Sequence, residues 1–252
     1  MRGTEVSSKP ASTIAGWLQL NELTAGQCET LLKLAPRSLP GTGQDRQVPS
    51  PDGPALWALA ADCLSETLPE LASDILRTAS QTRVDFAPDP RNYPRPFTLH
   101  MPVDGQVYVS CPLAGTPWDA LTVAHEFGHA LQLNCCSGVQ LPPVLRETAA
   151  FVAEAVVAGA LALRDTPLAD PVCRAYARRT LTDLGPIAKR LRAALACPDT
   201  PYDDCWNYPP ARQIAQALTQ GDRPLRTGIA ASVFRGDAQL GALVSLLCSD
   251  AE

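Results

Sequence analysis

The segment from residue 117 to 133 constrains the fold most strongly, because its sequence predicts a helix that carries two histidines and a glutamate. Thr116 and Pro117 are typical of a helix start, since a threonine hydroxyl caps the first turn and proline fits the first helical position. Asp119, three residues after the predicted cap, completes the start signal. The predicted helix contains VAHEFGHA at 123–130.

On this helix His125 and His129 lie about one turn apart, so both imidazoles project from the same face. Glu126 lies about 100° around the helix from His125, beside the space in front of a metal ion held by the two histidines. HExxH is the arrangement of zinc metalloproteases, with two imidazole ligands and the glutamate as general base. The short motif also occurs by chance, so the hypothesis requires a third ligand.

Few residues qualify as that ligand. The chain contains three histidines, and the third, His100, precedes the motif in a predicted strand. The first acidic residue after the motif is Glu147. Cys135 and Cys136 lie between the motif and Glu147 and are alternative zinc ligands.

The apolar segment RETAAFVAEAVVAGALAL predicts a second helix over about 145–163. Glu147 and Glu154 are seven residues apart, so they lie on one face of this helix, two turns from each other. Two carboxylates on an apolar helix are costly to bury without partners. A metal ion at Glu147 and a histidine N–H at Glu154 would remove that cost.

Composition excludes several classes of protein. Apolar residues make up 46% of the 252, charged residues 19%, and the net charge is −5, without the basic runs that bind nucleic acid. No apolar run reaches the roughly 18–20 residues of a membrane span. Nine cysteines without a repeated spacing or an export signal indicate reduced thiols and a cytoplasmic protein.

The layout is that of a mainly α protein with a small β-sheet (α+β). Small and polar residues predict a flexible tail over 1–16, and one domain follows over 17–252. A hairpin turn is predicted at Asp104-Gly105, and breaks in the helical pattern at Gly185-Pro186, at 198–210 and around Gly221. Besides the two helices above, we expect helices at 24–34, 55–66 and 68–80. A C-terminal helical region is expected over 170–249, with helices at 209–220, 225–234 and 238–248. Strands are expected at 83–86, 97–101 and 106–111.

HEFGHAL, followed by a helix with glutamates seven residues apart, resembles the thimet oligopeptidase/oligopeptidase F family of zinc metallopeptidases. The resemblance covers about residues 95–160, where RPFTLHMPVDGQVYVSCPLAGTPWDALTVAHEFGHAL is similar to the family's strand, loop and second strand before the motif helix. It implies a zincin-like core of the gluzincin type with one Zn²⁺ per chain. The roles that it implies are zinc ligands His125, His129 and Glu147, base Glu126, and supporting carboxylate Glu154.

The sequence also departs from this family. Family members are several hundred residues long, with a large helical lobe over the site, so this chain would be a shortened, single-lobed member with a more open cleft. The linker between the two metal-site helices is shorter, and Gln132 stands where the family often has histidine. The family's C-terminal histidine and tyrosines have no full counterpart. Tyr202 and Tyr208 in PYDDCWNYPPARQ are the candidate phenolic donors to the reacting carbonyl.

We expect the substrate to be a specific peptide or protein segment that docks as an added strand along the predicted sheet. His100 and Tyr108, on the two strands before the motif helix, are the candidate substrate contacts. The C-terminal helices are expected to form the far wall of the cleft. No sequence feature indicates an oligomeric state.

Two other functions remain open. Two histidines and one carboxylate also describe the facial triad of non-haem Fe²⁺ oxygenases, which would modify a peptide rather than cut it. The glutamate after the first histidine favours a hydrolase over an oxygenase. A non-catalytic binding protein with a retained metal site is the third class, although such a protein has no need of Glu126.

Overall fold

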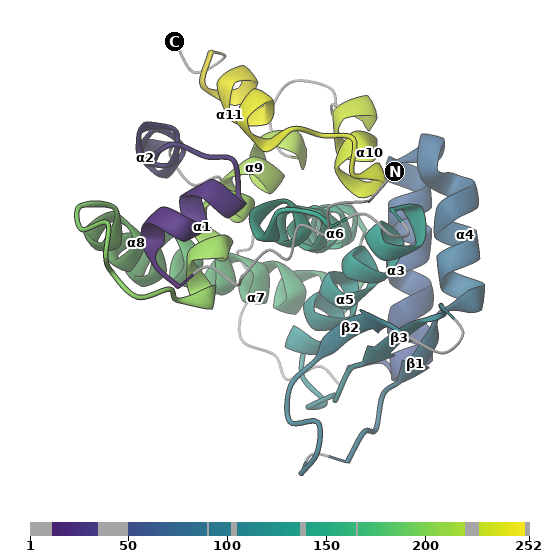
Figure 1. Ribbon diagram of the computed structural model, residues 1–252. Coiled ribbons are helices and arrows are strands. Elements are labelled where there is room, and N and C mark those ends of the chain that lie inside the picture. The colour runs from purple at the N-terminus through teal and green to yellow at the C-terminus, as the bar shows by residue number, and fades with distance from the viewer. Residues whose placement is uncertain are drawn as a thin grey trace, which may run out of the picture.

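The computed structural model describes residues 12–34, 50–89, 91–101, 105–136, 140–164, 166–219 and 227–249. Within these residues the chain is mainly helical with one three-stranded sheet, which confirms the predicted fold class at this level. In Figure 1 the sheet lies at one side of the molecule, and two long helices separate it from the C-terminal helices. Asp104 of the predicted hairpin turn lies outside the described residues.

Three of the four helices before the sheet were predicted from local signals. The helix predicted at 24–34 is α2, and it begins with a capping box, in which Gln27 N–H donates to the Thr24 hydroxyl and Thr24 N–H donates to the Gln27 side chain. The predicted tail was too long at its end, since Ile14 and Trp17 are buried in a helix. The bounds are α1 Ile14–Leu20, α2 Ala25–Lys33, α3 Gly53–Thr67 and α4 Ala72–Gln81, with the 3₁₀ turn η1 Pro69–Leu71.

The sheet lies against the motif helix. Its strands are β1 Arg83–Asp85, β2 Phe97–His100 and β3 Val107–Ser110, in the order β1-β3-β2, with β1 parallel and β2 antiparallel to β3. Val107 and Val109 are buried, and they pair with His100 and Thr98 of β2, so these four side chains share the inner face. β2 is therefore the edge strand next to the motif helix.

The motif helix α5 spans Trp118–Cys135, two residues longer than predicted at its C-terminal end. Its start differs from the prediction, because the Thr116 side chain caps nothing. The Asp119 carboxylate instead accepts hydrogen bonds from the backbone N–H groups of Ala114, Gly115 and Thr116. The acidic residue of the start signal thus fixes the turn that leads from β3 into α5.

The second metal-site helix, α6 Pro143–Ala162, packs closely along α5. Gly128 makes this approach possible, because a Cβ atom there would lie 2.7 Å from Ala150 Cα and 2.9 Å from the Ala149 carbonyl oxygen. Both distances are shorter than carbon atoms tolerate without movement of the α6 backbone. The glycine of HEFGH therefore has a structural role between the two histidines.

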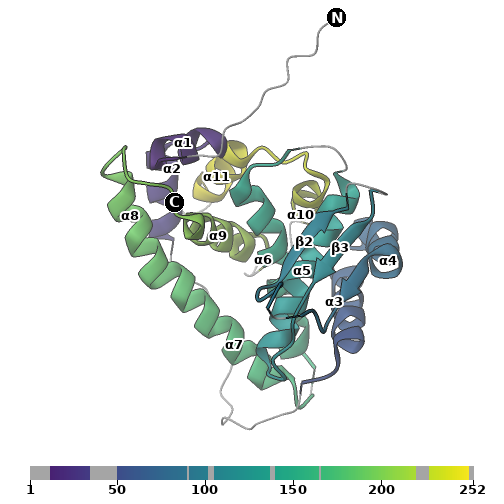
Figure 2. The same cartoon turned by 60° about the horizontal axis from the view of Figure 1, so that its bottom comes forward.

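Helices α7 Ala169–Thr182 and α8 Ala188–Leu195 form one continuous rod, which Figure 2 shows along one side of the molecule. The predicted break at Gly185-Pro186 is therefore wrong. The segment Asp183–Ile187 is a π-helix, whose wider turn accommodates a proline that would clash in an α-helix. This π segment also brings Asp183 to a buried position.

The predicted C-terminal helices are confirmed within the described residues, with shifts of a few residues at their ends. α9 packs along α6, and α2 and α11 contact α9. A short 3₁₀ segment, η3 Asp204–Asn207, leads into α9 inside the region predicted to lack helix. No helix in the described ranges combines the length and the apolar character that crossing a bilayer requires. The bounds are α9 Tyr208–Thr219, α10 Thr227–Arg235 and α11 Leu240–Ser249.

Candidate metal centre

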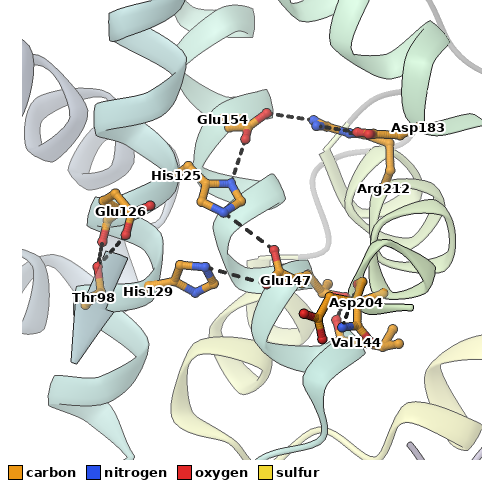
Figure 3. A network of polar contacts seen from close by, with 12 residues as sticks. Thr98, His125, Glu126, His129, Val144, Glu147, Glu154, Asp183, Asp204 and Arg212 are labelled. Atoms are coloured by element: carbon orange, nitrogen blue, oxygen red, sulfur yellow. Dashed lines mark hydrogen bonds and ion pairs between the residues drawn. The ribbon is translucent and has the colours of Figure 1, made fainter. Parts of the chain in front are cut away.

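Two facing helices bring the three predicted ligands together (Figure 3). His125 and His129 project from α5, and Glu147 projects from α6. Glu147 Oε2 lies 3.5 Å from His125 Nε2, and Glu147 Oε1 lies 3.9 Å from His129 Nε2. One ligand atom from each residue lies within 4.8 Å of the others, so this group could hold a metal ion.

The chemistry of the donors fits a divalent transition metal. Two atoms bound tetrahedrally about 2.0–2.2 Å from one ion lie roughly 3.3–3.6 Å apart. The two distances from Glu147 to the histidines, 3.5 and 3.9 Å, are close to this spacing. Glu147 Oε2 is buried and has no hydrogen-bond partner among the described residues. Buried carboxylate oxygens normally have partners, and a cation would supply the missing one. The alternative ligands Cys135 and Cys136 do not belong to the group.

Burial determines the electrostatics of the three ligands. It raises the pKa of Glu147 and lowers the pKa of His129 well below its usual value, with a further lowering from His125. Burial also opposes protonation of His125, but the hydrogen bond to Glu154 and its charge outweigh this effect and raise the His125 pKa. A neutral His129 and an uncompensated carboxylate are the forms that bind a cation.

Glu154 contacts His125 on the side away from Glu147. Its Oε1 accepts a hydrogen bond from His125 Nδ1 at 2.7 Å, which leaves Nε2 directed toward Glu147. Glu154 is completely buried and also contacts two arginines, Arg212 Nη1 at 2.8 Å and Arg179 Nη1 at 3.1 Å. Orientation of a metal-binding histidine by a carboxylate on its other nitrogen is a general feature of zinc sites.

Glu126 is buried beside the ligand group but is not part of it. Its Oε2 accepts a hydrogen bond from the Thr98 hydroxyl on β2 at 2.6 Å, so the carboxylate is directed toward the edge strand (Figure 3). Burial raises the pKa of Glu126, while the charge of His125 and the bond from Thr98 lower it in part. The glutamate of HExxH is thus not one of the three residues that could bind the metal ion.

Both predicted tyrosines lie on the α9 side of the metal group. The Tyr208 ring contacts the edge of Phe151 at 5.9 Å between centroids, and Phe151 in turn contacts His125 at 5.4 Å. Burial and then the charge of Glu147 raise the Tyr208 pKa to about 12. The Tyr202 hydroxyl accepts a hydrogen bond from the Asn207 amide at 3.1 Å, and its pKa is also raised to about 12, mainly by burial. Both phenols therefore remain protonated donors.

The structure separates the two predicted substrate contacts. His100 is on the inner face of β2 together with Thr98. Tyr108 is on the outer face, where its ring contacts Phe97 at 6.0 Å and Arg83 lies 5.8 Å from its centroid. Tyr108 is therefore not brought to the metal group, whereas His100 belongs to the strand that contacts Glu126.

Sequence reasoning missed Thr98, Arg179, Asp183 and Arg212. Each is far from the motif in sequence, and none has a spacing that relates it to HEFGH or Glu147. The one available signal was Arg212, a cation within the otherwise uncharged helix YPPARQIAQALT. A single buried arginine on such a helix indicates a buried acidic partner.

Searches for a matching protein family, curated protein or solved structure found none.

Proposed function

We propose that this protein is a zinc-dependent peptidase in which His125, His129 and Glu147 hold the metal and Glu126 is the general base. The observation that carries the proposal is that four polar groups, buried or half-buried, have two different positions. Three converge within 4.8 Å, and the fourth lies beside them with its carboxylate outside the ligand group. A site with three protein ligands leaves one tetrahedral position for water or substrate, which is typical of catalytic zinc.

A zinc ion held by this group would lower the pKa of a water molecule to roughly 7 and polarise the carbonyl of a bound peptide. Glu126 would take the proton of the attacking water and transfer it to the leaving amine. The raised pKa of Glu126 supports this role, because a more basic carboxylate accepts the proton more readily. Thr98 would hold the carboxylate on the side of the edge strand.

Tyr208 is the better candidate for stabilising the negative charge that develops on the carbonyl oxygen. Its ring is fixed against Phe151, and no hydrogen bond among the described residues engages its hydroxyl. The Tyr202 hydroxyl, in contrast, is engaged by Asn207. A protonated phenol near Glu147 is suited to donate one hydrogen bond in the transition state.

The substrate would lie along β2. Among the strands of the described residues β2 is one of the two edges and pairs on one side only, so its outward backbone groups could take an added peptide strand. Thr98 and His100 alternate with Leu99 along it, which places two polar side chains on the face toward α5. A peptide paired with β2 would pass the Glu126 carboxylate.

We also interpret the chain as a short relative of the thimet oligopeptidase/oligopeptidase F enzymes. The hydrogen bond from His125 to the second glutamate of E-x₆-E supports this interpretation, because it is the contact that the resemblance implies for that glutamate. The same ligand set would also accept Fe²⁺, so the experiment must distinguish hydrolysis from oxygenation.

The test uses protein loaded with Zn²⁺ or, without oxygen, with Fe²⁺, incubated with a peptide library and analysed by mass spectrometry. Peptidase activity yields pairs of fragments whose summed mass exceeds the parent by one water. Glu126→Gln should keep the bound zinc and lose at least about a hundredfold in rate. Uncleaved products that gain one oxygen atom, only with Fe²⁺, O₂ and an added two-electron co-substrate such as a 2-oxo acid, would contradict the proposal, as would full activity of the Gln variant.

A further inference from the structure

A cluster of four charged side chains, three of them buried and the fourth, Arg179, half-buried, lies directly behind the metal group. Glu154 on α6 contacts Arg212 on α9 and Arg179 on α7, and Arg212 contacts Asp183 of the π segment. Glu154 and Arg212 are both completely buried, and Asp183 is nearly so. Three separate parts of the chain therefore meet at the carboxylate that orients His125 (Figure 3).

Arg212 is held from several sides. Its Nε and Nη2 lie 3.0 and 2.8 Å from Asp183 Oδ2, while its Nη1 donates to Glu154 Oε2 at 2.8 Å. Its guanidinium also lies 3.7 Å from the centre of the Phe151 ring. The planar guanidinium can satisfy two carboxylates and an aromatic face at once, which a lysine ammonium cannot.

These contacts reach His125 by two routes. The first runs through Glu154, whose other oxygen accepts the His125 Nδ1 hydrogen bond. The second runs through Phe151, whose ring lies between the guanidinium and the His125 imidazole, 5.4 Å from the latter. Without Arg212, the Oε2 atom of this completely buried carboxylate would lose its 2.8 Å contact, and only Arg179, at 3.1 Å from Oε1, would remain as a cationic partner. The carboxylate would then be less firmly held, and a rotation of its oxygens would release His125.

We infer that Arg212 is a positioning residue of the metal centre. It fixes Glu154 and Phe151 so that His125 presents Nε2 to the ion, with Asp183 holding Arg212 in turn. The inference rests on the metal-binding part of the proposed function but not on peptide hydrolysis. It assigns to α9 a direct effect on metal affinity, although no ligand lies on that helix.

The test compares zinc affinities by competition with a chromophoric chelator. Arg212→Met should weaken zinc binding about 10–100-fold, as loss of a supporting group does in other zinc sites. Arg212→Lys, which keeps the charge but not the bidentate geometry, should recover part of the loss. The double variant Arg212→Met/Asp183→Asn removes both charges together, so it avoids an unpaired buried carboxylate at Asp183 if the single variant fails to fold.

Two controls separate positioning from general stability. Ile75→Ala truncates a completely buried side chain on α4, which carries no member of the cluster, and should lower the unfolding temperature without changing zinc affinity. The absorption bands of bound Co²⁺ should shift in Arg212→Met and Glu154→Gln but not in Ile75→Ala.

The outcomes are separable. Wild-type zinc affinity and an unchanged Co²⁺ spectrum in folded Arg212→Met or in the double variant would overturn the inference, while cleavage by the wild-type protein would leave the proposed function intact. Failure of the wild-type chain to bind zinc or cobalt would overturn both. A weakened zinc site in a protein that cleaves no peptide would support the inference alone.

Discussion

Glu147 is the residue on which the metal centre depends, because it alone comes from outside the HExxH helix. One of its buried oxygens has no hydrogen-bond partner within the described residues. Such an atom costs free energy in the metal-free protein, and a bound cation removes that cost. Metal binding should therefore stabilise the native state by mass action.

We expect Glu147→Ala to abolish the rise in unfolding temperature that zinc gives the wild-type protein. In the presence of a chelator the variant should unfold within about 1 kcal/mol of the metal-free wild type, because the Glu147 oxygens lie 3.5 and 3.9 Å from the two histidines, too far for strong hydrogen bonds. Thermal unfolding with zinc and with chelator measures both effects. Glu29→Ala, an exposed glutamate on α2, should keep the full response to zinc, and an undiminished response in Glu147→Ala would exclude Glu147 as a ligand.

Thr98 provides the second test at this scale. Thr98→Val removes the hydroxyl that donates to Glu126 but keeps the volume and the strand preference of the side chain. We expect the turnover number to fall about tenfold, the value of one hydrogen bond to a charged group, with unchanged zinc affinity. Thr98→Ser retains the hydroxyl and should retain most of the activity. Equal activity of the valine and serine variants would show that this hydrogen bond does not matter for the reaction.

The residues that the structure groups as a possible metal site could be related to one another from the sequence by helix geometry. His125 and His129 share a face through their spacing, and the same argument joins Glu147 to Glu154. Thr98 and Arg212 could not be predicted, since 28 residues separate Thr98 from Glu126 and 58 separate Arg212 from Glu154. Only the packing of the sheet and of α9 creates those contacts.

At the scale of helices and strands, local signals were sufficient where they were strong. The helix predicted at 24–34 begins at the capping box of Thr24, and the three predicted strands have nearly the observed bounds. The helix break predicted at Gly185-Pro186 was wrong, because the chain forms a π turn that accommodates the proline and the helix continues. Helix α1 was missed because its seven residues follow a polar segment and derive their stability from burial of Ile14 and Trp17.

The close contact between α5 and α6 at Gly128 can be tested by substitution. Gly128→Ala would force its Cβ against the α6 backbone, and we expect it to lower the free energy of unfolding by about 1–3 kcal/mol. Urea denaturation of metal-free protein measures this loss without a contribution from ligand binding. Gly159→Ala on α6 is the matched control, because open space surrounds that position and alanine should stabilise the helix by about 0.5–1 kcal/mol. Similar effects of the two changes would contradict the close packing at Gly128.

Across the whole molecule, the N-terminal helix joins the two halves of the site. The Asn21 side chain accepts a hydrogen bond from Val144 N–H in the first turn of α6, the helix that carries Glu147. Trp17 Nε1 donates to Asn207 at 2.7 Å, and the Asn207 amide donates to Tyr202. Helix α1 therefore contacts both the ligand helix and the tyrosine segment.

We expect Trp17→Phe to destabilise the protein by about 1–3 kcal/mol, because it leaves a buried Asn207 oxygen without its donor. Peptidase activity should fall more than zinc affinity, since the change acts on the tyrosine segment and not on the ligands. Trp118→Phe, the same substitution at a partly exposed site, should change stability by no more than about 0.5 kcal/mol. Equal changes in stability for the two variants would contradict the inference that α1 supports the tyrosine segment through Trp17.

The position of Arg212 on α9 has a consequence for biosynthesis. A ribosome releases HEFGH and Glu147 first and Arg212 more than sixty residues later than Glu147. Until α9 has docked, Arg212 does not fix the Glu154 carboxylate that orients His125. The growing chain would then bind an ion only weakly through His125, His129 and Glu147. Metallation should therefore be a late event, completed on a finished chain rather than during translation.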